Sequence, residues 1–123
     1  MSNSDFGAFI RLRRAALRLS LRSFAEKAEL DPGNASRIER GRVAPPEGAD
    51  ILDRIASALE LRKGSSEYQQ LIDLAAAAKG RIPEDLLADE EVASRLPILF
   101  RTLRSKPLSG EQLEKLIESI RKA

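Results

Sequence analysis

An abrupt corner at Asp31 and Pro32 separates two short helical segments and limits how this chain can fold. Asp31 predicts an N-cap, and Pro32 fits the first helical position, where a missing N–H costs nothing. The helix that follows ends at Gly41 and contains only Ala35 and Ile38 as plainly apolar residues. A helix this short is unstable in water unless packing holds it. We therefore expect these two side chains to fix the helix to a core, with its outer face left free for a partner.

Apolar residues recur at helical spacing along most of the chain, whereas strand-like alternation and Asn-Gly or Asp-Gly hairpin signals are absent. Asp5 or Ser4 is the predicted cap of the first helix, Ser20 of the second, and Ser65 or Ser66 of the fifth. The pattern predicts an all-α fold that begins with five helices, at about residues 6–18, 21–28, 32–41, 47–59 and 66–79.

Each of these helices is expected to turn an apolar face inward, so that residues 1–79 form one compact domain around a shared core. The predicted core side chains are Phe6, Phe9, Ile10, Leu17, Leu21, Phe24, Ala25, Ala28, Leu30, Ala35, Ile38, Ala49, Ile51, Leu52, Ile55, Ala56, Leu59, Tyr68, Leu71, Ile72, Leu74, Ala75 and Ala78.

Residues 80–91 are acidic and contain glycine and proline, which predicts a linker or a short docking helix. Beyond it lies a C-terminal helical segment, residues 92–123. Two helices are predicted there, at about residues 92–104 and 110–122. Ser109 and Gln112 have the capping-box spacing that opens the second helix. Its apolar residues form a single stripe: Leu113, Leu116, Ile117 and Ile120.

The chain contains no histidine and no cysteine. A Ser-His-Asp or Cys-His nucleophile, a disulfide and a thiolate metal site are therefore impossible. No pair of carboxylate, lysine or tyrosine side chains stands at a spacing that suggests catalysis. We expect no catalytic residues, no metal site, no cofactor and no enzyme activity.

Charge is distributed unevenly along the chain, although the net charge is only +2. Residues 1–44 hold nine basic and five acidic side chains, a net of +4. Residues 83–95 hold one basic and five acidic side chains, a net of −4. A basic N-terminal part suits a polyanion such as nucleic acid, but an ordinary solvated helical surface has the same composition.

Four groups of residues carry a resemblance to a known family: Leu19-Ser20, Phe24-Ala25-Glu26-Lys27-Ala28, Leu30-Asp31-Pro32 and Ser36-Arg37-Ile38-Glu39-Arg40-Gly41. Together they resemble the helix-turn-helix of the lambda-repressor-like, XRE family of regulators over about residues 6–61. The resemblance implies a five-helix DNA-binding domain whose third helix reads the major groove of double-stranded DNA.

The same resemblance implies a role for individual residues. Base contacts fall on Pro32, Gly33, Asn34 and Arg37. Phosphate contacts fall on Ser36, Arg40 and Arg42, to which the exposed basic positions Arg18 and Arg22 are added. Arg14 and Glu39 match a structural ion pair between the first and third helices. Independently, Arg can bond guanine O6 and N7, and Asn can bond adenine N6 and N7. Arg37 could instead be an ordinary solvated arginine, and Asn34 could simply support the helix start.

Two positions depart from the family pattern. Leu21 stands where many relatives have a glutamine that contacts phosphate, and Arg22 beside it is a substitute contact. Arg13 stands where many relatives have leucine, so the first helix is less apolar than usual.

The C-terminal segment carries more apolar surface than two helices can hide alone. The residues concerned are Val92, Leu96, Ile98, Leu99, Phe100 and Leu103. Since one such domain reads too few base pairs for useful specificity, we expect a homodimer on a palindromic site. The alternative is that the segment folds back on the fifth helix.

A weaker resemblance covers Gly80-Arg81-Ile82-Pro83, Asp89-Glu90-Glu91, Leu96-Pro97 and Leu99-Phe100-Arg101-Thr102-Leu103-Arg104. These residues are similar to the tails of XRE repressors that accompany ImmA/IrrE-like zinc metallopeptidases in phage-defence and DNA-damage operons. The resemblance implies cleavage between about Leu96 and Leu108, with Leu99, Phe100 and Leu103 as the side chains that a protease would bind. A constitutive dimer that is never cleaved is the alternative.

These observations predict a sequence-specific DNA-binding repressor that regulates its own small operon. The alternative is an antitoxin, a protein-interaction module that neutralises a partner through residues 81–123. No run reaches the roughly 18 apolar residues of a membrane span, and MSNSDFGAFIRLRR lacks the apolar stretch of a secretory signal. We expect a cytoplasmic, nucleoid-associated protein without membrane contact.

Overall fold

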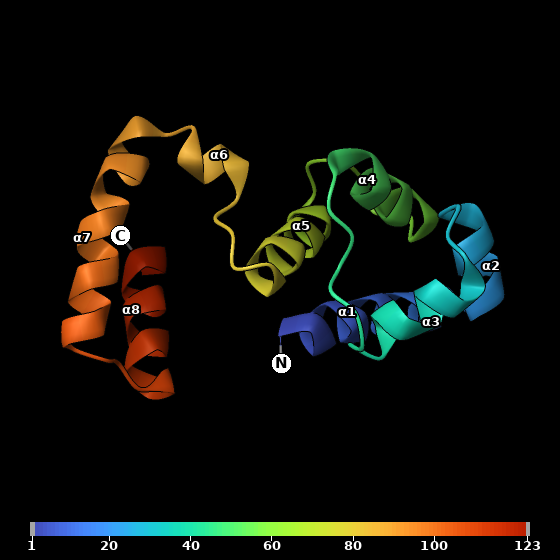
Figure 1. The fold of residues 1–123 in the computed structure, drawn as a ribbon, viewed down its shortest axis with the longest axis horizontal. Coiled ribbons are helices and arrows are strands. Elements are labelled where there is room, and N and C mark those ends of the chain that lie inside the picture. Colours follow the sequence, from blue (N-terminus) through green and yellow to red (C-terminus); the bar gives the residue numbers. More distant parts are fainter. Residues whose placement is uncertain (1, 123) are drawn as a thin grey trace. The chain divides into compact units, whose positions relative to one another are not determined.

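The computed structural model describes residues 2–122, with side chains from residue 3 onward. Across this range the chain forms eight α-helices and no strand, which confirms the predicted all-α fold (Figure 1). The helices divide into two compact units, one that ends at Pro83 and one that begins at Glu84. Each unit is described by itself.

The first unit contains the five predicted helices. They are α1 (Ser2–Ala16), α2 (Leu21–Lys27), α3 (Pro32–Glu39), α4 (Ala49–Ala58) and α5 (Ser66–Ala78). The caps predicted for α2, α3 and α5 are confirmed. The side chain of Ser20 accepts from the N–H of Ser23 at 3.0 Å, and those of Asp31 and Ser65 each accept from the third residue after them at 3.1 Å.

The predicted start of α1 was wrong. The helix already includes Ser2, so Ser4 and Asp5 lie inside its first turns and do not cap it. The physical reason is a tertiary contact, because a Cβ atom on Gly41 would lie only 2.7 Å from the Ser4 hydroxyl oxygen. The N-terminal turn of α1 is thus packed against the chain just after α3, a partner that local sequence does not reveal.

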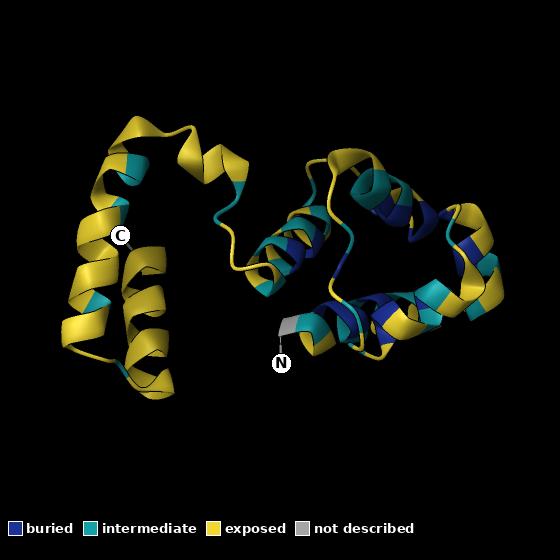
Figure 2. Ribbon diagram, viewed as in Figure 1, coloured by how far each residue is buried: buried dark blue, intermediate teal, exposed yellow. Residues whose placement is uncertain are grey.

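Helix α1 lies at the centre of the first unit, where it packs against both α3 and α5, while α2 packs against α3 and α4. Their inward faces form one apolar core, shown in dark blue in Figure 2. Its buried side chains are Phe6, Ile10, Phe24, Ala25, Ala28, Ala35, Ile38, Ile55, Ala56, Ala58, Leu59, Leu61, Leu71 and Ala75. Most other predicted core residues are half-buried at its edge, but Ala49 is exposed in the first turn of α4, so that prediction was wrong.

The second unit contains α6 (Glu84–Leu87), α7 (Glu90–Ser105) and α8 (Gly110–Lys122). Helix α7 begins two residues earlier than predicted, because Asp89 accepts from the N–H groups of Glu91 and Val92. Pro97 lies inside α7 without ending it. The capping box of α8 is confirmed by two bonds: Ser109 N–H to Gln112 Oε1 at 2.9 Å, and Gln112 N–H to Ser109 Oγ at 3.2 Å.

Burial separates the two units. Among the described residues 84–122, no side chain is buried, and Figure 2 shows this part almost entirely in the colour of exposed residues. A further finding concerns membranes: over the described part of the chain, no helix is both long and apolar enough to cross a bilayer.

Candidate nucleic-acid interface

Helix α3 is anchored by the two side chains that its sequence singles out. Ala35 is 0% exposed and Ile38 is 3% exposed, and both belong to the core of the first unit. Asp31 caps the N-terminus of the helix, and Pro32 occupies its first position. These contacts hold a helix of only eight residues, which would not persist alone in water.

The first two turns of α3 carry the residues predicted to contact bases. Pro32, Gly33 and Arg37 are exposed, and Asn34 is half-buried. Within the described part of the chain, no hydrogen bond or ion pair engages the side chains of Asn34 and Arg37. A Cβ atom on Gly33 would lie 3.6 Å from Arg37 Nη1, so the guanidinium lies beside the bare backbone of the first turn. At the N-terminal end of α3 the structure thus places side-chain hydrogen-bond donors beside a stretch of backbone that no bulky side chain covers.

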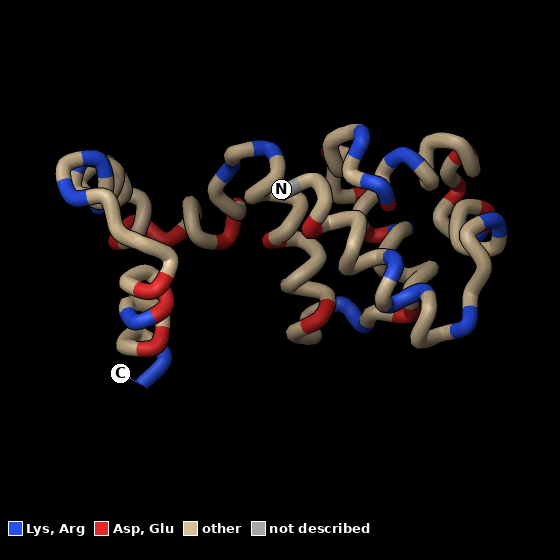
Figure 3. The backbone as a smooth tube through the Cα atoms, turned by 90° about the horizontal axis from the view of Figure 1, so that it is seen from below, with Lys and Arg blue, Asp and Glu red and all other residues tan. Residues whose placement is uncertain are grey.

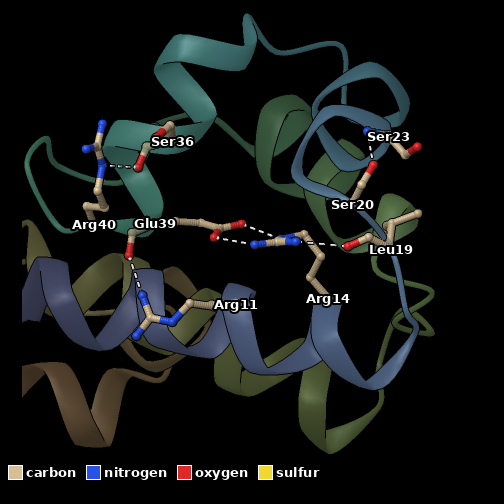
Figure 4. A network of polar contacts seen from close by, with 8 residues as sticks. All are labelled: Arg11, Arg14, Leu19, Ser20, Ser23, Ser36, Glu39 and Arg40. Carbon is tan, nitrogen blue, oxygen red and sulfur yellow. Dashed lines mark hydrogen bonds and ion pairs between the residues drawn. The ribbon is translucent and has the colours of Figure 1, made fainter.

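Glu39 is turned away from this surface by the pair expected with Arg14, drawn in Figure 4. Arg14 Nε donates to Glu39 Oε2 at 2.7 Å, and Arg14 Nη2 donates to Oε1 at 2.9 Å. Arg14 Nη1 also donates to the carbonyl of Leu19 at 2.9 Å. The hydrogen bond to Glu39 raises the pKa of Arg14. Burial of the guanidinium lowers this pKa, and the negative charge of the carboxylate raises it. The only buried acid among the described residues is therefore neutralised inside the fold and does not repel a polyanion.

Helices α1 and α3 approach so closely that only glycine fits between them. A Cβ atom on Gly7 would lie 2.3 Å from the carbonyl oxygen of Glu39 and 2.6 Å from that of Ile38. Arg11 Nη1 donates to the same Glu39 carbonyl at 3.2 Å. Gly7 thus sets how closely α3 packs against α1. The sequence did not reveal this role, because the partners of Gly7 are about thirty positions away.

Two further arginines close the ends of other helices. Arg13 Nε donates to the carbonyl of Leu59 at 3.0 Å, at the end of α4. Arg54 Nε donates to the carbonyl of Ala28 at 3.1 Å, at the end of α2. A cation at a helix C-terminus satisfies unpaired carbonyls and complements the helix dipole. The polar residue at position 13, unexpected in an apolar helix, is therefore a tertiary cap.

The predicted phosphate contacts come from four parts of the first unit. Arg18 is exposed just beyond α1 in a left-handed conformation with φ 54°, and Arg22 is exposed on α2. At the end of α3, Arg40 is exposed and its Nε donates to the carbonyl of Ser36 at 3.4 Å. Arg42 is exposed in the loop that follows. Figure 3 shows basic residues along this unit, on several of its elements.

The residues predicted for dimerisation or cleavage all lie in the second unit. Leu99 and Phe100 are exposed on α7, whereas Leu96 and Leu103 on the same helix are half-buried. Leu108 is half-buried in the loop between α7 and α8. Apolar side chains thus remain at the surface of this unit, and none of them is covered completely by its own chain.

A family model of the helix-turn-helix domain matches residues 5–64, just under half of the chain. The match spans α1 to α4 and includes the α2–α3 corner with its caps. This part of the chain is therefore similar to helix-turn-helix domains. Such a domain is a DNA-binding element, and the match supports a DNA-binding transcriptional regulator rather than an enzyme.

Two solved structures of the clp gene regulator ClgR from Corynebacterium glutamicum are similar to this chain. One is 27% identical with a TM-score of 0.47, covering 63% of this chain and 92% of that one. The other is 25% identical with a TM-score of 0.48, covering 88% of this chain and 97% of that one. No curated protein was found to match the chain.

Proposed function

We propose that this chain is a sequence-specific transcriptional repressor that acts as a homodimer on a palindromic operator of its own small operon, in the cytoplasm and on the nucleoid. One observation carries the proposal. Helix α3 is fixed by Ala35, Ile38 and the Arg14–Glu39 pair, whereas Arg37 is exposed and Asn34 is half-buried. The side chains of Asn34 and Arg37 have no hydrogen bond or ion pair among the described residues.

These two side chains suit the edges of base pairs. Arg37 can donate two parallel hydrogen bonds to guanine O6 and N7, and Asn34 can bond adenine N6 and N7. Pro32 and Gly33 add little bulk, which lets the first turn of α3 approach the floor of the major groove. Phosphates on either side would meet the basic and polar side chains of Arg18, Arg22, Ser36, Arg40 and Arg42. Because phosphate neutralisation releases counterions, binding is expected to weaken steeply with salt.

The second unit supplies the dimer. Its apolar side chains stay exposed in the single chain, and a second copy would cover them. Two linked heads on a palindrome bind far more tightly than one, because the second head binds from a high effective concentration.

Proteolysis in the second unit is proposed as the release mechanism. Cleavage between Leu96 and Leu108 would separate the heads and remove that gain in affinity. The exposed side chains of Leu99 and Phe100 support this proposal, since a protease must reach the residues it binds. If a zinc metallopeptidase is encoded beside this chain, incubation with it should yield fragments whose masses place the cut there. An intact chain under activating conditions would overturn cleavage and leave DNA binding in place.

The same exposed surface suits an antitoxin that covers a toxin with residues 81–123. One pair of cell experiments distinguishes the repressor from the antitoxin. Repression of a reporter by the chain alone supports the repressor, whereas rescue of cells from a lethal neighbouring gene supports the antitoxin.

Selection from a pool of random duplexes tests the proposed DNA binding. The full chain should enrich a palindromic site, and Arg37→Ala should lose preference at one base pair of each half-site, at a cost of about 1–3 kcal/mol. Arg62→Ala, which removes another exposed arginine after α4, is the matched control and should change neither affinity nor preference. Equal enrichment by both variants would contradict the assignment of α3 to the groove.

A further inference from the structure

Helix α8 presents an apolar stripe that its own chain covers only in part. Leu113, Leu116, Ile117 and Ile120 are between 39% and 67% exposed, and every described residue of the helix is exposed. Their spacing of three, one and three residues places them on one face of the helix. The chain's own second unit therefore leaves part of this face exposed, and the charged residues around it indicate which partner covers the rest.

Two opposite charges border the same edge of this stripe. Glu114 and Arg121 are seven residues apart, which is about two helical turns, so both lie along one side of the apolar face. The midpoint between them falls next to Ile117, near the centre of the stripe. By the same geometry, Glu111 and Lys115 lie on the opposite side of the helix, where their side chains approach to 3.7 Å as an i,i+4 pair.

The own-chain contacts of these two bordering residues are weak. Arg121 Nη1 lies 3.8 Å from Glu118 Oε2, and the Arg121 side chain remains 73% exposed. No hydrogen bond or ion pair of Glu114 is found among the described residues. Along the bordering edge, the acid Glu114 therefore precedes the base Arg121, an order that is complementary to the same edge of a second copy running in the opposite direction.

We propose that the apolar stripe of α8 pairs with α8 of a second copy in antiparallel direction, with Glu114 of each copy against Arg121 of the other. An antiparallel two-fold arrangement places the same edge of both helices together, so the axis near Ile117 generates two identical acid–base pairs. A parallel arrangement brings each charged edge against the opposite, uncharged edge, which carries Gln112 and Ser119. The charge pattern thus selects both the partner and its direction.

This inference rests on the proposed homodimer and specifies its interface. The test uses the full chain and two charge reversals, Glu114→Arg and Arg121→Glu. Each variant alone faces like charges at both symmetric positions and should dimerise about 10- to 30-fold more weakly in sedimentation equilibrium. Mixing the two variants restores an acid opposite a base at both positions, so a heterodimer of near wild-type affinity should form.

Glu111→Arg and Lys115→Glu are matched controls, because they make the same charge changes on the opposite side of α8. Each should retain the wild-type dimer constant, with the helix content of all four variants checked by circular dichroism. A wild-type dimer that tolerates both bordering reversals, or a mixture that stays as weak as its components, would overturn the antiparallel pairing while the proposed dimer stands. A wild-type chain that is monomeric at every concentration would overturn both, and duplex binding at low salt would then show whether the proposed DNA recognition survives.

Discussion

Helices α3 and α8 are both too short to be stable alone, but they leave opposite kinds of surface uncovered. In α3 the apolar residues Ala35 and Ile38 are buried, and the polar side chain of Arg37 is exposed. In α8 no described residue is buried, and an apolar stripe that includes Leu116 and Ile117 faces solvent. Helix α3 therefore lacks only a polar partner, whereas α8 lacks the apolar contacts that would hold it in place.

The comparison teaches that the kind of surface left open indicates the kind of partner. On a helix that the core holds in place, an asparagine and an arginine without a side-chain partner suit base edges and phosphates. An apolar stripe bordered by self-complementary charges suits another copy of the same helix. A chain with both surfaces can bind DNA through one unit and associate through the other, and the stability of the two units should respond differently to mutation.

The largest effect is expected in the core that supports α3. Phe24→Ala should lower the free energy of unfolding by about 3–5 kcal/mol, because it removes a fully buried ring and leaves a cavity. Urea titration at two protein concentrations checks this prediction. The loss should be the same at both concentrations, and a loss below 1 kcal/mol would show that the first unit does not depend on this core.

The next largest effect is expected for the Arg14–Glu39 ion pair between α1 and α3. Glu39→Gln should cost about 2–3 kcal/mol, because it leaves the partly buried guanidinium of Arg14 without its counter-charge. The partly exposed Arg14 makes this loss smaller than that of a fully buried pair. Thermal unfolding measures it, with Glu26→Gln on the exposed side of α2 as the control. If both variants unfolded like the wild type, the pair would not fix α3.

A change of similar chemistry in α8 should act on association instead. Ile117→Ala removes an apolar side chain from the centre of the exposed stripe, so the dimer constant should weaken about tenfold, which is 1.4 kcal/mol. The unfolding of the first unit should stay within about 0.5 kcal/mol of the wild type. Sedimentation equilibrium and urea titration on the same sample separate the two effects. A loss of stability in the first unit without a loss of association would reverse the comparison.

The smallest effect concerns pH. A hydrogen bond to Asp53 raises the pKa of Tyr68, and burial and the Asp53 charge act in the same direction. A pKa raised in the folded state contributes stability that is present below about pH 10, where unfolded tyrosine ionises, and lost as pH rises through the folded value. Tyr68→Phe should therefore flatten the fall in stability above about pH 10. Unfolding free energies of both proteins across that range give the answer, and parallel curves would contradict the role of this bond.

The local signals in the sequence predicted the caps of α2, α3 and α8, since a Ser or Asp side chain at the helix start bonds a backbone N–H three residues away. They also predicted that Ala35 and Ile38 anchor α3. Local signals could not predict contacts between distant parts of the chain.

Gly7 and Arg13 show this limit. Gly7 is required by the backbone of α3, and Arg13 bonds the end of α4, 46 residues further along the chain. Neither partner leaves a trace in the residues around positions 7 and 13. The packing of the Ser4 turn against Gly41 is a third such contact, and it explains why α1 starts earlier than its sequence indicates.

The most direct test of the central claim is a side-chain NMR titration of the full chain with a duplex that carries the selected site. The duplex should shift the amide protons of Asn34 and the Nε–H of Arg37, while the methyl signals of Ile117 and Ile120 respond to dilution of the protein. Signals of Asn34 and Arg37 that stay unchanged in a saturated complex at low salt would contradict the account, because α3 would then not be the surface that meets DNA.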